Sequence, residues 1–76
     1  MKEAIKYRGY VVQAIPDGSE GIWRTQVRIR CESEEGLPDQ KYIAVEEWGT
    51  REKAVAASLE LGRRVIDGEI EGLTPP

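Results

Sequence analysis

In the stretch WRTQVRIRC, residues 23–31, every second position is Arg24, Gln26, Arg28 or Arg30, so three of these four positions hold an arginine. Successive side chains of a strand point to opposite faces, so this period puts the three guanidinium groups on one face. A guanidinium group binds carboxylate or phosphate oxygens through parallel N–H donors. These three residues, called the arginine stripe below, therefore predict a surface suited to anionic groups.

Three interpretations of the arginine stripe stay open. In the first, the arginines serve solubility alone, covering apolar surface with their stems and pairing with carboxylates such as Glu46 across the ladder. In the second, the stripe and Tyr42 form a platform for single-stranded nucleic acid, whose bases stack on the ring. In the third, this face or an edge strand joins another protein chain, including a second copy whose acidic helix side meets the basic sheet.

Residue types suited to catalysis are scarce in this sequence. The chain has no histidine and one cysteine, so a paired-cysteine metal spacing is absent. No glycine-rich loop leads from a strand into a helix, and the carboxylates lie mainly in a polar loop or on a helix. Cys31 continues the apolar side of its strand, which predicts a buried, reduced thiol. We expect a non-enzymatic protein without a metal or cofactor.

Length and composition are typical of one small globular domain. The 76 residues are 39% hydrophobic and 33% charged. We expect a single domain over residues 1–76, with an ordered core of about 5–70 and a loose tail at 71–76. The start has no apolar run resembling a signal peptide, and no stretch has the length of a membrane span. We therefore expect a cytoplasmic protein without membrane contact.

Charge is distributed unevenly along the chain. The formal net charge is −3, but residues 1–31 hold six Lys and Arg against three Asp and Glu, whereas residues 32–76 hold five against eleven. The two segments therefore carry +3 and −6. Such a field can steer a partner protein or a second copy of the chain. The overall negative sign argues against nonspecific nucleic-acid binding.

The elements that must position the arginine stripe are strands followed by a helix. We expect strands at 7–15, 22–31 and 41–48, joined by a hairpin turn at 16–21 and a polar loop at 32–40. Thr50 is a candidate N-cap for a helix that reaches about Ile66, with Gly68 as its stop. Apolar and small residues at helical spacing predict one buried side. They are Ala54, Val55, Ser58, Leu59, Leu61, Gly62, Val65 and Ile66.

Two further residues suggest how this helix packs. Gly62 lies in mid-helix, where glycine costs about 1 kcal/mol relative to alanine, so we expect a close approach to a sheet side chain such as Trp23. Trp48 precedes the helix, and two roles stay open for it. It is either a hydrophobic staple that fixes the helix entry or an exposed anchor in an interface.

These expectations combine into an α+β fold, a three-stranded antiparallel meander packed on one C-terminal helix (β-β-β-α). One helix covers one face of a sheet, so we place Arg24, Arg28, Arg30 and Tyr42 on the uncovered face. We expect a non-enzymatic protein-interaction or adaptor module that uses this face. Single-stranded nucleic-acid binding by the same Arg/Tyr face is the alternative.

Several stretches also resemble known families. YRGYVV, GIWRTQVRI and TREKAVAASLELGRRVIDG together resemble a family of short proteobacterial proteins of unknown function, which share a Tyr-Arg-Gly-Tyr strand, a Trp-led strand and a helix ending in Ile-Asp-Gly. This resemblance implies a small α+β domain and assigns no site residue. A more distant similarity is to the N-terminal domain of HicB-type antitoxins. It rests on a loose match at Gly21, Trp23, Thr50, Glu52 and Ala54, and the Pro-Gly-Cys stretch of those antitoxins is absent here.

Overall fold

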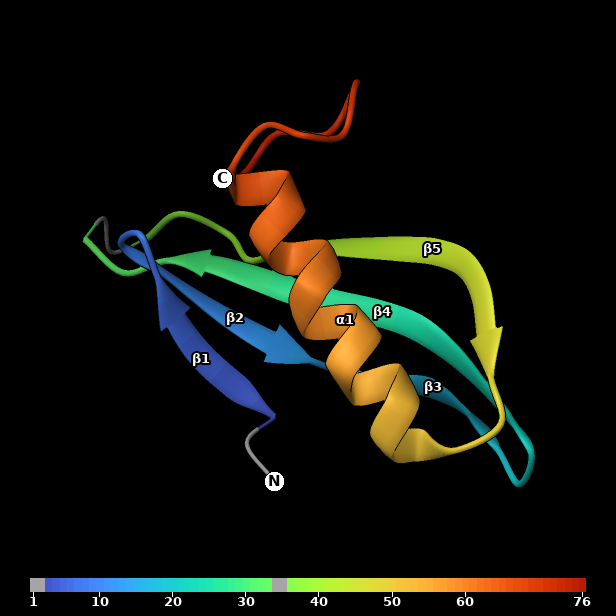
Figure 1. The fold of residues 1–76 in the computed structure, drawn as a ribbon. Coiled ribbons are helices and arrows are strands. Elements are labelled where there is room, and N and C mark those ends of the chain that lie inside the picture. The colour runs from blue at the N-terminus through green and yellow to red at the C-terminus, as the bar shows by residue number, and fades with distance from the viewer. Residues whose placement is uncertain (1–2, 34–35) are drawn as a thin grey trace.

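The computed structural model describes residues 3–33 and 36–76, which form an antiparallel sheet with one helix across one face (Figure 1). In chain order the elements are β1 (Ala4–Tyr7), β2 (Tyr10–Ala14), β3 (Asp17–Ser19), β4 (Ile22–Cys31), β5 (Gln40–Trp48) and α1 (Arg51–Ile66). The expected α+β class with a C-terminal helix is confirmed. The sheet has five strands, so the three-stranded meander is wrong.

β4 is the central strand of the sheet. It pairs with β5 along one edge, and with β2 and then β3 along the other. β2 pairs in turn with β1, which forms the far edge. All pairings are antiparallel, and β1, β3 and β5 each pair with one neighbour only, so these three are outer strands of the described sheet.

Of the two additional strands, β1 is separated from β2 by a turn at the start of the expected first strand, and β3 lies within the segment 16–21 that was expected to be a hairpin turn. Arg8 and Gly9 have φ values of 49° and 83°, both in the left-handed region that two-residue hairpin turns favour. The stretch YRGY is therefore a hairpin turn between β1 and β2, where a continuous strand was expected. Pro16 separates β2 from β3, because proline has no N–H to donate to the ladder.

The helix begins and ends where the sequence predicts. The Thr50 hydroxyl accepts a hydrogen bond of 3.3 Å from the backbone N–H of Lys53, which confirms the N-cap. Ser58 joins the helix to β4, because its Oγ accepts the backbone N–H of Gln26 at 3.0 Å and donates to the carbonyl of Ala54 at 2.6 Å. No helix among the described residues is long and apolar enough to cross a membrane.

The core lies between α1 and the sheet face beneath it, called the helix side below. Its buried cluster comprises Val12, Val27, Ile29, Tyr42 and Val65. Gly62 lies against Val12 and Val27, so the expected close approach is confirmed, but its neighbour is not Trp23.

The segment expected to be a loose tail contacts the helix side. Leu73 packs against the core cluster. The carbonyl of Thr74 accepts a hydrogen bond from the Tyr42 hydroxyl, and that of Pro76 accepts one of 3.2 Å from Tyr10. Two tyrosines therefore hold the last residues against the domain.

Candidate functional site

The arginine stripe lies on the sheet face turned away from α1, called the open face below. Along β4, Thr25, Val27 and Ile29 are buried towards the helix, and the arginines occupy the positions between them. Cross-strand partners share a face, so the register identifies the neighbours of the stripe. Side chains of the open face are Ala4, Lys6, Val11, Gln13, Asp17, Ser19, Ile22, Arg24, Gln26, Arg28, Arg30, Lys41, Ile43, Val45 and Glu47.

Tyr42 is not on this face, which corrects the expectation that it joins the three arginines. It lies opposite Val27 in the register and is only 7% exposed, on the helix side. Burial raises the pKa of its hydroxyl above the ordinary value. The alternation expected for β5 is right, with Ile43 and Val45 on one side and Tyr42 on the other. The prediction that Tyr42 lies on the uncovered side of the sheet is wrong, because α1 covers the Tyr42 side of β5 and leaves Ile43 and Val45 exposed.

All five aromatic residues of the chain belong to the helix side. Tyr7 lies opposite Tyr10 in the register, and Tyr10 lies opposite Cys31. Cys31 shares the face of Val27 and Ile29 on β4, so both tyrosines belong to the helix side. Trp23 lies opposite Trp48, whose indole N–H donates a hydrogen bond of 2.8 Å to the buried Thr25 hydroxyl. The chain contains no phenylalanine. The open face therefore offers no ring on which a base could stack.

Ion pairs on the open face engage only part of its positive charge. Arg24 lies 3.8 Å from Glu47, and Arg28 lies 3.9 Å from Asp39. The expected partner Glu46 belongs instead to the helix side of β5. Within residues 3–33 and 36–76, Arg30 and Lys41 form no ion pair. Two cations of this face are thus available to an external anion.

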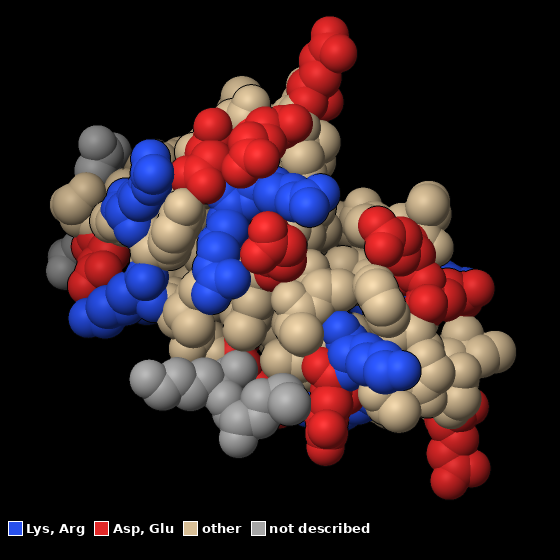
Figure 2. All heavy atoms as spheres, viewed as in Figure 1, with Lys and Arg blue, Asp and Glu red and all other residues tan. Residues whose placement is uncertain are grey.

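Helix α1 is not acidic, which corrects one basis for self-association. Figure 2 shows acidic and basic side chains interspersed over the helix side. Helix α1 itself carries four basic residues and two acidic ones. The Glu60 carboxylate lies 3.3 Å from Arg63 and 3.5 Å from Arg64, within the helix. A basic sheet therefore has no acidic helix to meet on a second copy.

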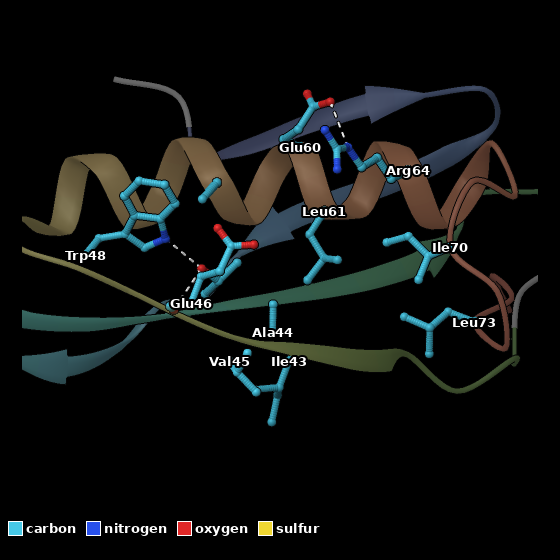
Figure 3. A pocket seen from close by; sticks show the side chains of 12 residues that line it. Ile43, Ala44, Val45, Glu46, Trp48, Glu60, Leu61, Arg64, Ile70 and Leu73 are labelled. Carbon is cyan, nitrogen blue, oxygen red and sulfur yellow. Dashed lines mark hydrogen bonds and ion pairs between the residues drawn. The ribbon is translucent and has the colours of Figure 1, made fainter.

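A groove between β5 and α1 is a feature that the sequence reasoning missed. It has a volume of about 510 Å³, and Leu61, Ile70 and Leu73 form its apolar wall (Figure 3). Ala44 points into it from β5, and Trp48 closes one end. Trp48 is half-buried and hydrogen-bonded, so it is tied to β4 rather than projecting freely. Ile70 and Leu73, the apolar residues that follow the helix, are the sequence signal that could have indicated this groove.

Comparison with known proteins assigns no role to these surfaces. No family model, curated protein or solved structure matches the chain. The resemblances to the short proteobacterial family and to HicB-type antitoxins therefore stay predictions. The described part of the chain holds no group of three or more side chains suited to a metal ion.

Proposed function

We propose that this protein is a non-enzymatic protein-interaction module whose open face binds an acidic segment of a partner protein. The observation that supports this most is the arginine stripe on an uncovered face, with Arg30 and Lys41 lacking an ion pair among the described residues. Arginine N–H donors match carboxylate oxygens in a planar, two-point geometry. A strand carrying glutamate or aspartate would supply those oxygens along the stripe.

The existing ion pairs present little obstacle to such a partner. Both Arg24 and Glu47 are more than half exposed, and their separation is 3.8 Å. Exposed pairs of this kind contribute little to stability, so an external carboxylate can replace Glu47 at low cost. Exposed apolar residues lie beside the cations, because Ile43 is 67% and Val45 97% exposed. They add apolar contact that a purely electrostatic surface would lack.

Single-stranded nucleic acid fits the same face less well. Its phosphates would meet the guanidinium groups as carboxylates do. Its bases would find no aromatic platform, because all five rings belong to the helix side. Without stacking, such binding would rest on phosphate contacts alone and fall steeply with salt.

The test compares two probes on the full chain by isothermal titration calorimetry. One is a synthetic peptide that alternates glutamate with valine, and the other is single-stranded oligouridine. We expect the peptide to bind, and Arg30→Glu to weaken its binding by about tenfold or more, since charge-assisted hydrogen bonds are lost. Lys53→Glu, an identical charge change on the exposed side of α1, is the matched control and should leave the affinity unchanged.

Three outcomes would contradict the proposal. The peptide could fail to bind at low salt, or the two variants could weaken it equally, which would indicate a net-charge effect. Oligouridine binding without peptide binding would favour the nucleic-acid alternative.

A further inference from the structure

β5 is a long outer strand whose second edge is unoccupied in the described part of the chain. It has nine residues and no proline, and it pairs only with β4. The opposite outer strand, β1, has four residues. An unpaired edge presents a row of backbone N–H and C=O groups that can pair with another strand. β5 is therefore the edge on which the sheet can be extended.

The open-face side chains of β5 are arranged in a self-complementary order. Lys41 and Glu47 stand at the two ends, with Ile43 and Val45 between them. When a second β5 runs antiparallel to the first with Ala44 opposite Ala44, each Lys41 lies opposite a Glu47. Each Ile43 then lies opposite a Val45. Opposite charges and apolar pairs at directly opposed positions both stabilise antiparallel strands.

We propose that two copies of this chain form a dimer by antiparallel pairing of their β5 strands about a two-fold axis at Ala44. The two sheets then become one continuous sheet, and the same surface patch serves both copies. Four apolar side chains, two from each copy, meet at the centre of this interface. Val45, at 97% exposure, is the most exposed large apolar residue of the described chain and is covered by this pairing.

The irregular pairing between β4 and β5 does not disturb this order. The register shifts between Arg24 and Gln26, so residues 44–46 of β5 lie opposite Thr25 alone, and the Thr25 hydroxyl donates to the Glu46 carbonyl at 3.3 Å. Side chains still alternate through this region. Ile43 and Val45 point away from α1, whereas Ala44 points towards it (Figure 3).

Charge identifies a second copy, rather than an acidic segment, as the occupant of this edge. An acidic strand beside β5 would bring carboxylates against Glu47, whereas a second β5 presents Lys41 at that position. The pairing uses Lys41, Ile43 and Val45 but leaves the arginine stripe of β4 uncovered, so the dimer and the proposed binding of an acidic partner share β5 but not the arginines. Arg30→Glu should therefore leave the dimer intact.

Sedimentation velocity over a range of concentrations tests the dimer with two single variants. Lys41→Glu places Glu opposite Glu47, and Glu47→Lys places Lys opposite Lys41, twice in each dimer. Two pairs change from attraction to repulsion, so each variant alone should weaken the dimer by about tenfold or more. An equal mixture of the two variants should dimerise as wild type does, because opposite charges again face each other. Lys53→Glu is the control that should change nothing.

The mixture separates the proposed interface from a folding defect, because an unfolded variant would not recover on mixing. Circular dichroism of each variant provides a second check. The proposal is overturned if the wild-type chain stays monomeric throughout the concentration range. It is also overturned if either single variant dimerises as wild type does, or if the mixture is as weak as its components.

Discussion

Gly62 marks the closest approach between α1 and the sheet, and replacing it by alanine measures how tight that approach is. A Cβ atom at this position would lie less than 3.0 Å from Cγ1 of Val12 and 3.2 Å from Cγ2 of Val27. Both valines are fully buried, at 0% exposure. As β-branched residues they have few alternative rotamers. The added methyl group therefore forces α1 away from the sheet.

Two opposing terms set the expected magnitude for Gly62→Ala. Helix propensity favours alanine over glycine by about 1 kcal/mol. Overpacking a well-filled core costs roughly 1–3 kcal/mol, and two rigid neighbours place this site near the upper limit. The free energy of unfolding should therefore fall by about 2 kcal/mol, which lowers the Tm of a domain of this size by on the order of 10 °C.

Urea and thermal denaturation followed by circular dichroism measure this change. The control is the same substitution in a Val12→Ala background, where the closer of the two contacts is gone and only that with Cγ2 of Val27, at 3.2 Å, remains. There Gly62→Ala should be neutral or stabilising by up to about 1 kcal/mol, because the helix-propensity gain then opposes only the milder contact with Val27. If Gly62→Ala stabilises the protein while Val12 is present, α1 does not rest on β2 and this reasoning is refuted.

Three further predictions concern contacts that join distant segments. Arg51 donates to both carboxylate oxygens of Glu3 and lowers the pKa of that carboxyl below its ordinary 4.5. The stability advantage of wild type over Glu3→Gln should thus be present above pH 4.5 and vanish as pH falls through the lowered pKa in thermal scans. Thr25→Val removes the acceptor of the Trp48 indole N–H, so urea denaturation should show a loss of about 1–2 kcal/mol; an unchanged midpoint would contradict that hydrogen bond. Tyr42→Phe should cost about 1 kcal/mol and speed amide exchange in the C-terminal tail, whereas unchanged exchange would mean that the tail is not held there.

The helix and the central strand could be predicted because their signals are local. Thr50 stands directly before a run of strong helix formers, and its side chain caps the helix as expected. The strict period of two in β4 determines which of its residues share a face without any knowledge of its neighbours. The strand occupies Ile22–Cys31, the span that the sequence predicts.

The β1–β2 hairpin could not be recognised because its turn residues are unusual. Two-residue hairpin turns favour Asn-Gly or Asp-Gly, since both central residues need positive φ. Here Arg8 takes the first of these positions, with φ of 49°. Arginine is uncommon in that region, so a propensity argument treats the stretch as continuous strand.

The position of Tyr42 depends on strand register rather than on any local pattern. Alternation in β5 shows that Tyr42 and Ile43 lie on opposite faces, but it does not say which face α1 covers. Register assigns Tyr42 to Val27 and Ile43 to Gln26. Exposed Ile43 and buried Tyr42 reverse the usual preference of an isoleucine for the core. The face predicted from the sequence is therefore right for the three arginines and wrong for the tyrosine, and the binding role of that face stays a prediction.

Solvent paramagnetic relaxation measured by NMR tests most directly that one helix covers one face and leaves the arginine stripe uncovered. A neutral gadolinium chelate broadens only nuclei that solvent reaches. We predict strong broadening of the side-chain Nε–H signals of Arg24 and Arg30, while the methyl signals of Val27 and Ile29 stay sharp. Protection of the arginine signals, or broadening of the two methyl-bearing residues, would contradict the arrangement on which the proposed function rests.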